Sequence, residues 1–364
     1  MEFAMRDTPI KNARIVAKLR ERIVDGHYPA GSRLPTCQEL ERDFKASRMT
    51  VLKALDRLKR DQFIRTDGRR GTFVATHPPQ LYRYALVFSE RRLSRFSQAL
   101  FQATETIQSE SLRRLPPFFG VDGHTDVEDY GRLLSDVRAQ RLAGMIFVAQ
   151  PGILSGSPLF EDGGLPRVAL VEEPDVPGVA SVSLDSNAYI RQAVQQFVRW
   201  GCRRIGVLAT AHQSADWRSR FEAALCQSGM ETRRRWLLGA DVRFPHWVPN
   251  AVAAIFDGEA CPDGFLIADD HLVEPATKAL VELGLRVPAD LRVLAHGNFP
   301  CLPTSVVPVT WIGFDACDIL NAACAVIDAW RKNGPPSAPV RVEAQIREPG
   351  ESADLPPKPG KERP

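Results

Sequence analysis

The stretch from Leu34 to Leu58, LPTCQELERDFKASRMTVLKALDRL, restricts what this chain can fold into more than any other. Its apolar residues recur three and four positions apart, which predicts two short helices that each bury one face. We expect Thr36 to cap the first helix, with Glu39 as its capping-box partner, and Ser47 to cap the second. The buried face of the second helix comprises Val51, Ala54, Leu55 and Leu58. Its opposite face carries Arg48, Met49, Leu52 and Lys53, and such a helix can lie in a DNA major groove.

The residues around this stretch predict the rest of a small DNA-binding domain. Residues 63–65 and 72–74 favour two short strands, and the turn between them holds two glycines and two arginines. Upstream, residues 10–25 form an amphipathic pattern that predicts a further helix. A helix-turn-helix followed by a basic hairpin is a winged helix, which we expect within residues 1–76.

Three runs in this region resemble the GntR-family winged helix-turn-helix: HYPAGSRLPT at 27–36, SRMTV at 47–51 and GTFV at 71–74. The resemblance covers about residues 8–77 and implies a domain that binds double-stranded operator DNA. Taken with the position of the second helix, it gives the residues expected to contact DNA: Arg33, Thr36, Gln38, Ser47, Arg48, Met49, Thr50, Lys53, Arg69, Arg70 and Gly71.

This sequence departs from the family pattern at three positions. The family usually has arginine where Gln38 and Leu52 stand, and glycine where Lys45 stands, so we expect a different operator sequence. Leu52 either contacts a thymine methyl group or packs under the wing, and packing is the favoured reading. The same two readings apply to Met49. Lys53 either contacts DNA or is an ordinary solvated charge.

The distribution of charge agrees with a small DNA-binding domain, called the head below, joined to a larger domain, called the body. Cysteine usage agrees with this as well. Residues 1–80 hold 17 Lys and Arg against 10 Asp and Glu, a net charge of +7, whereas the remainder carries −4. The seven cysteines are odd in number and show no CxxC spacing, which argues against a disulfide framework and against a structural zinc site. We find no signal-peptide pattern and no apolar run long enough to span a membrane, so we expect a cytoplasmic protein without membrane contact.

After a proline-rich linker at residues 77–81, strand and helix patterns alternate twice over residues 82–348. Continuous apolar runs at residues 84–88, 144–148 and 264–268 are typical of parallel strands covered on both faces. The last helix pattern begins at Phe314, and one last strand is expected at residues 340–346. The alternation predicts an α/β body of two doubly wound lobes with a ligand cleft between them. Residues 349–364 are rich in Pro, Lys and Glu, which predicts a disordered tail.

Two blocks of the body resemble the LacI-type effector domain, which is similar to type 1 periplasmic binding proteins. They are VSLD at 182–185 with WGCRRIGVL at 200–208, and GFLIADD at 264–270 with LGLRVPADLRVL at 283–294. The resemblance implies a small polar effector, a carbohydrate in our reading, and its motif positions give as effector-binding residues Asp270, Trp217, Arg218 and Asn298. Ser89 and Gln150 are added because they end strands of the first lobe and could line the cleft.

Each of these assignments has a structural alternative. Asp270 could instead, or also, cap the helix that begins near Leu272. Trp217 stands where the family has its cleft arginine, and it could stack on a sugar or belong to the core. The family's aspartate after the next strand is missing from Ala295–Asn298, where we read His296 as a loop residue.

The sequence thus favours a homodimeric transcription regulator, a repressor, whose operator binding responds to a small ligand. An alternative is a DNA-binding dimer whose body has lost its ligand and serves only for pairing. We expect no enzyme and no cofactor, because GxSxG, HExxH and phosphate-loop motifs are absent. A pyridoxal-phosphate body would need a Schiff-base lysine, and Lys278 is the only lysine between Arg83 and Arg331.

Overall fold

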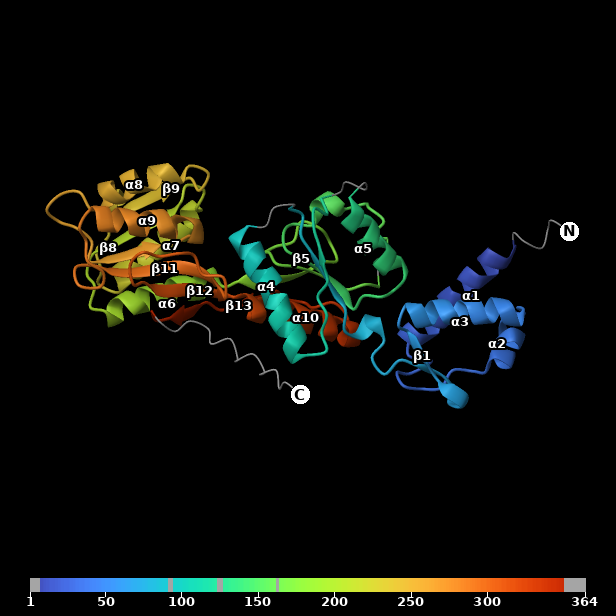
Figure 1. The fold of residues 1–364 in the computed structure, drawn as a ribbon. Coiled ribbons are helices and arrows are strands. Elements are labelled where there is room, and N and C mark those ends of the chain that lie inside the picture. Colours follow the sequence, from blue (N-terminus) through green and yellow to red (C-terminus); the bar gives the residue numbers. More distant parts are fainter. Residues whose placement is uncertain (1–6, 91–93, 123–126, 162–163, 350–364) are drawn as a thin grey trace, which may run out of the picture. The chain divides into compact units, whose positions relative to one another are not determined.

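The computed structural model describes residues 7–90, 94–122, 127–161 and 164–349 (Figure 1). The chain divides into two compact units. The first comprises residues 1–91, 107–181 and 323–339, and the second comprises residues 92–106, 182–322 and 340–364. The first unit therefore contains the predicted DNA-binding head together with most of the first α/β lobe, and the second contains the other lobe.

The head is a winged helix-turn-helix, as the sequence predicted. Its helices are α1 (Asp7–Val24), α2 (Cys37–Phe44) and α3 (Arg48–Arg60). An antiparallel hairpin of β1 (Ile64–Asp67) and β2 (Gly71–Val74) follows. The segment before α2 joins this hairpin, because Leu34 N donates to Thr72 O and Val74 N to Ser32 O. The buried core that joins these elements comprises Ile15, Leu19, Ile23, Leu40, Val51, Ala54, Leu58 and Phe63.

The helix ends of the head follow from local sequence. Thr36 and Glu39 form the expected capping box at the start of α2, and Ser47 Oγ accepts from Thr50 N at the start of α3. Lys45 ends α2 with a φ of +48°, in the left-handed region that favours glycine. Lysine therefore replaces the family's turn glycine without a change of fold, at the cost of a less favoured backbone conformation.

The first lobe is built on a parallel sheet with the order β13-β7-β6-β5-β3-β4. Its strands are β3 (Tyr84–Val87), β4 (Pro117–Phe118), β5 (Gly144–Phe147), β6 (Arg167–Ala169), β7 (Ala180–Leu184) and β13 (Val340–Val342). Helices α4 (Arg95–Glu110) and α5 (Glu128–Arg138) connect the first three. All four residues of β3 and of β5 are buried, as expected for strands covered on both faces.

The second lobe has a sheet with the order β14-β12-β11-β10-β8-β9, in which only β14 is antiparallel to its neighbour. The strands are β8 (Ile205–Thr210), β9 (Leu237–Ala240), β10 (Gly264–Ile267), β11 (Arg292–Phe299), β12 (Thr310–Asp315) and β14 (Gln345–Arg347). The helices are α6 (Ser186–Arg199), α7 (Ala215–Gln227), α8 (Val248–Ile255) and α9 (Asp270–Glu282). Helix α10 (Ala316–Asn333) begins in the second unit, but from Ala323 onward it belongs to the first, where Asp328 accepts a hydrogen bond from the Tyr84 hydroxyl. This doubly wound α/β architecture is the predicted fold class.

Two expectations about strands were wrong. No strand was expected at β12, because its apolar residues run directly into the helical pattern of α10 and only pairing with β11 separates them. The single strand expected at residues 340–346 is two strands, one in each sheet. The tail expected at 349–364 lies outside the described residues from Gly350 onward. Among the described residues, no helix has both the length and the apolar character needed to cross a membrane.

Candidate nucleic-acid interface and polar cluster

The outer face of α3 is open to solvent. Arg48, Met49, Leu52 and Lys53 are all exposed, whereas Val51, Ala54 and Leu58 on the opposite face are completely buried. Neither Arg48 nor Lys53 forms an ion pair with any residue that the structure describes. Both cations are therefore available for phosphate or base contacts at the start of a helix that presents no competing carboxylate until Asp56.

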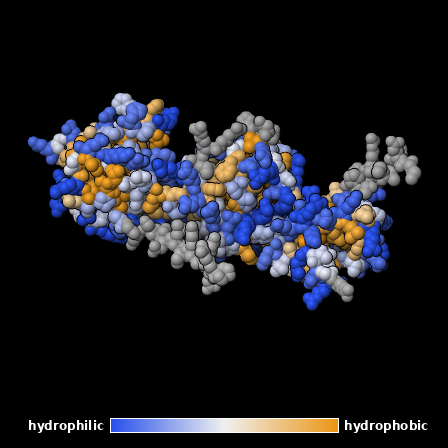
Figure 2. Space-filling model, viewed as in Figure 1, coloured by the Kyte–Doolittle hydropathy of each residue, from blue (hydrophilic) through white to orange (hydrophobic). Residues whose placement is uncertain are grey.

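The exposure of Leu52 shows that the expectation that it packs under the wing was wrong. Its exposed fraction is 44%, and that of Met49 is 61%. The reason is helical geometry, because the wing strand β1 follows the buried face of α3 and Leu52 lies on the other face. Figure 2 shows hydrophobic surface on the head that is bordered by hydrophilic residues.

The wing places further basic groups beside α3. Arg33 forms a bridge to Phe73, and its guanidinium lies against the Cα of Gly71, so a Cβ added there would be 3.0 Å from Arg33 Nε. Gly71 has a φ of +116°, which other residues rarely adopt. Arg70 is exposed and lies 3.9 Å from the Asp67 carboxylate. The side chain of Arg69, also expected at the DNA, lies outside the described part of the chain.

Three expected DNA contacts have structural roles in the head. Thr50 is 5% exposed, and its hydroxyl lies 2.8 Å from Ser47 Oγ, so its side chain does not reach the outer face of α3. Thr36 and Ser47 are exposed but use their hydroxyls as helix caps. Gln38 is exposed on α2. Thr50 was expected to contact DNA because it lies in the family run SRMTV. Helical periodicity alone places it beside Val51 on the inner face.

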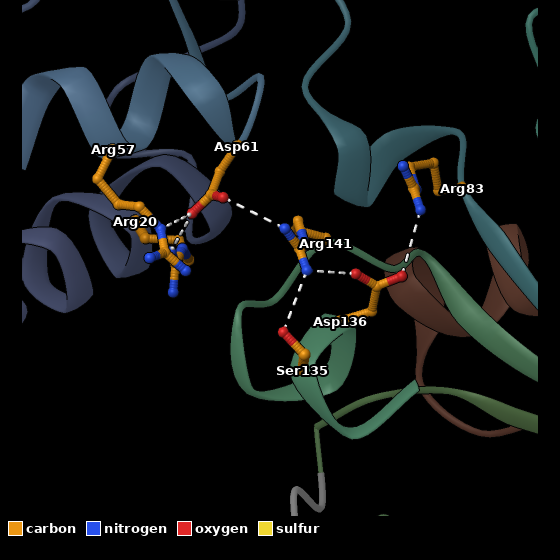
Figure 3. A network of polar contacts seen from close by, with 7 residues as sticks. All are labelled: Arg20, Arg57, Asp61, Arg83, Ser135, Asp136 and Arg141. Atoms are coloured by element: carbon orange, nitrogen blue, oxygen red, sulfur yellow. Dashed lines mark hydrogen bonds and ion pairs between the residues drawn. The ribbon is translucent and has the colours of Figure 1, made fainter. Parts of the chain in front are cut away.

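The C-terminal end of α3 carries a buried carboxylate that three arginines share (Figure 3). Asp61 is 6% exposed and accepts from Arg20 Nη2 of α1 at 3.0 Å and from Arg57 Nε at 3.1 Å. Arg20 is itself 7% exposed, and burial lowers the pKa of its guanidinium while Asp61 acts in the opposite direction. The Arg20–Asp61 pair therefore ties α1 to the end of α3 inside the head.

The third arginine continues this network within the first unit. Arg141, which follows α5, donates Nη1 to Asp61 at 3.2 Å and places Nη2 2.6 Å from Asp136 Oδ1. Arg83 Nη2 donates to the other oxygen of Asp136 at 3.2 Å. Figure 3 shows Arg141 between the two carboxylates. The network could not be predicted from the sequence, because its members are separated by up to 121 positions and no local motif marks them.

The second lobe carries a polar cluster at the carboxyl ends of β10 and β11. Asp270 is 4% exposed, and its two oxygens are occupied by His271 Nδ1 at 2.8 Å and by Asn298 Nδ2 at 2.8 Å. The cap of α9 is Asp269, which accepts from His271 N at 2.9 Å, and not Asp270 as the sequence suggested. Asp270 and Asn298, both expected at the effector, thus meet, but they bind each other.

Electrostatics in this cluster favour a protonated His271. Its hydrogen bonds to Asp269 and then to Asp270 raise its pKa to about 10. Burial acts to raise the pKa of Asp270, but the hydrogen bond from His271, the two nearby histidines and the hydrogen bond from Asn298 lower it overall. Ligand atoms of Asp269, Asp270 and His271 lie within 4.8 Å of one another, a spacing that could hold a metal ion. Here His271 Nδ1 lies 3.1 Å from Asp269 Oδ1 and 2.8 Å from Asp270 Oδ1, within hydrogen-bonding distance of both carboxylates.

Two polar atoms near this cluster are buried and have no hydrogen-bond partner among the described residues. They are the hydroxyl of Tyr189, which is 5% exposed, and Nδ1 of His296. The two rings lie 5.7 Å apart, and Tyr189 stacks on Phe314. His296 belongs to β11 and is not a loop residue, because β11 continues past Ala295 in register with β12. Buried polar groups without partners are uncommon in folded proteins and can bind a ligand's hydroxyls.

The other expected effector residues are distributed over both lobes. Trp217 is 7% exposed and stacks on Phe221 at 5.2 Å, which favours the core reading, and Arg218 beside it is half-buried. In the first lobe, Ser89 is half-buried after β3, and the Gln150 side chain bonds Glu173 O and Asp175 N. Gln150 therefore orders the loop that follows β6.

Lys278 pairs with Glu274 on the surface of α9.

Comparison with known proteins defines two domains. Residues 11–74 match the family described as bacterial regulatory proteins, gntR family, and residues 194–349 match the periplasmic binding protein-like domain. The chain therefore consists of a GntR-type helix-turn-helix domain followed by a periplasmic-binding-protein-like domain with a LacI-like fold.

Three individual proteins are similar to parts of this chain. The uncharacterized HTH-type transcriptional regulator YdfD of Bacillus subtilis is 37% identical over 73 residues, which are 20% of this chain and 15% of the relative. The HTH-type transcriptional repressor PurR of Photobacterium profundum is 23% identical over 189 residues, 50% of this chain and 55% of the relative. The solved structure of a LacI family transcriptional regulator from Arthrobacter, in complex with lactose, has a TM-score of 0.55 at 17% identity and covers 74% of this chain and 98% of its own.

Proposed function

We propose that this protein is a DNA-binding transcriptional regulator, a repressor that acts as a homodimer in the cytoplasm and whose operator binding responds to a small polar ligand. The observation that carries the proposal is the outer face of α3, where Arg48 and Lys53 are exposed and have no ion-pair partner among the residues that the structure describes, and the wing adds Arg70. A solvated face of this kind contacts phosphates and base edges when its helix enters the major groove.

Dimerisation follows from the geometry of operators. Two half-sites separated by one helical turn require two readers related by two-fold symmetry, which one head cannot supply. A duplex library selected with the full chain should therefore yield a palindromic operator. Band-shift titration against that operator at low salt tests the proposal, and no retardation of any duplex would reject it.

For the effector we propose a sugar that binds at the carboxyl ends of the strands in the body. The Tyr189 hydroxyl and His296 Nδ1 have no hydrogen-bond partner within the described ranges. Together with the Asp269 carboxylate, they offer donors and acceptors that suit ligand hydroxyl groups. The Arthrobacter structure contains lactose, so lactose is the first ligand to test in a thermal-shift screen of sugars and nucleosides. A ligand that binds the folded state raises the melting temperature.

The alternative is a dimeric regulator whose body has lost its ligand. The positions of Trp217, Asp270 and Asn298 favour it, because all three side chains are engaged within the protein. The same thermal-shift panel separates the two readings. A sugar that raises the melting temperature and changes operator affinity supports sensing, and a flat panel supports the pairing role.

The Asp61–Arg141 contact gives a route by which the body can act on the head. It joins Asp61, the C-cap residue of α3, to Arg141 in the segment after α5 of the first unit. A ligand changes operator affinity only if it prefers one of two arrangements of the protein. We propose that ligand binding relieves repression, and a reporter gene behind the selected operator measures the sign.

A further inference from the structure

We infer that Leu52, with Met49 beside it, recognises thymine methyl groups in the major groove of the operator. This inference rests on the proposed function, since it names a feature of the DNA that α3 reads. The starting observation is the exposure of two large apolar side chains, 44% for Leu52 and 61% for Met49, on the outer face of α3. They are three residues apart and so lie side by side on the helix surface.

The charged residues around Met49 and Leu52 indicate which kind of molecule this pair contacts. Arg48 precedes it and Lys53 follows it, and both are exposed cations without ion-pair partners among the described residues. An apolar protein surface would not match such a charged border, whereas a polyanionic duplex does. Phosphates and charged groups give Leu52 nothing to contact. The apolar group that the major groove does offer is the C5 methyl of thymine.

The helix position of Leu52 determines which contacts it can make. Within α3 the caps at Ser47 place Arg48 and Met49 in the first turn, and Leu52 lies one turn further along the same face. Thr50 and Val51 are excluded from this surface because they are buried. Leu52 therefore occupies the centre of the exposed face, where a side chain without hydrogen-bonding groups can distinguish bases only by shape and by methyl contact.

The experiment removes the methyl group and nothing else. The full chain selects its operator from a random duplex library, and each thymine is then replaced singly by deoxyuridine. The wild-type protein should bind about fourfold more weakly for each contacted methyl that is lost. These sensitive thymines should lie at one or two positions in each half-site, and this comparison requires no variant to fold.

Variants then assign the methyl contact to Leu52. Leu52→Ala should weaken binding to the thymine operator by a similar factor, and it should abolish the difference between thymine and deoxyuridine at one position. Met49→Ala should do the same at the neighbouring position. Lys53→Ala is the matched control, because it removes a charge from the same face: it should weaken binding to both duplexes equally and reduce the salt dependence.

The outcomes are separable. If wild-type protein binds its operator but ignores every thymine-to-deoxyuridine replacement, this inference is overturned and the proposed function stands. Unchanged deoxyuridine sensitivity in both Leu52→Ala and Met49→Ala overturns it as well. If no duplex is selected or retarded, the proposed function and this inference fail together. Self-association that is lost in Leu52→Ala without any change in DNA binding would assign the pair to an interface between copies and overturn the inference.

Discussion

The Asp61 carboxylate allows a quantitative test of what holds the head together. Asp61→Ala leaves Arg20 buried at 7% exposure without its carboxylate, and removing one partner of such a buried pair costs about 3–5 kcal/mol. Arg57 and Arg141 add little to this figure, because their side chains are 49% and 23% exposed and exposed pairs contribute at most about 1 kcal/mol each. The loss should fall on the head, where α1 and α3 meet.

Hydrogen exchange read by mass spectrometry on the full chain measures this loss by region. Amides in α1 and α3 should lose about two to three and a half orders of magnitude of protection, since 1.4 kcal/mol corresponds to tenfold. All six tryptophans lie between residues 200 and 330, so their fluorescence reports the body alone and should be unchanged.

The control is Asp56→Ala on the same helix. Asp56 pairs with Arg60, and both side chains are 67% exposed, so its loss should change protection by less than about 0.5 kcal/mol. If Asp61→Ala and Asp56→Ala produce equally small effects, burial does not make the Asp61 pair structurally important and the reasoning is refuted.

Three further predictions follow from the sites. Gly71→Ala should lower operator affinity and destabilise the wing by roughly 1–3 kcal/mol, because its φ of +116° disfavours a side chain; band shifts and exchange at β2 would show both effects. Tyr189→Phe should leave the unliganded melting temperature unchanged or higher, since its hydroxyl has no partner among the described residues, but should reduce the shift produced by an active sugar. The pKa of His271 is raised to about 10, so its stabilising contribution is complete below pH 6.5 and is lost as pH rises towards 10. Tryptophan-monitored unfolding of wild type should therefore lose more stability over that interval than His271→Asn does, and parallel curves would contradict the assignment.

The sequence predicted local structure well where local chemistry decides it. The capping box at Thr36, the cap at Ser47 and the buried face of α3 are set by residues within one or two turns of each other. Strands β3, β5 and β10 were recognised because burial on both faces requires continuous apolar runs. Strand β12 was missed, because its identity depends on pairing with β11 and not on its own pattern.

By itself, then, the sequence determined that a basic winged helix-turn-helix precedes a two-lobed α/β body. It also determined that α3 presents Arg48 and Lys53 outward, since helical periodicity fixes which face is apolar. Only the tertiary structure decided which polar groups are already satisfied. Asp270 binds His271 and Asn298, Trp217 stacks on Phe221, and the Tyr189 hydroxyl has no partner in the part of the chain that the structure describes. The Asp270–Asn298 bond joins residues 28 positions apart, and burial makes each of these contacts, or its absence, energetically important.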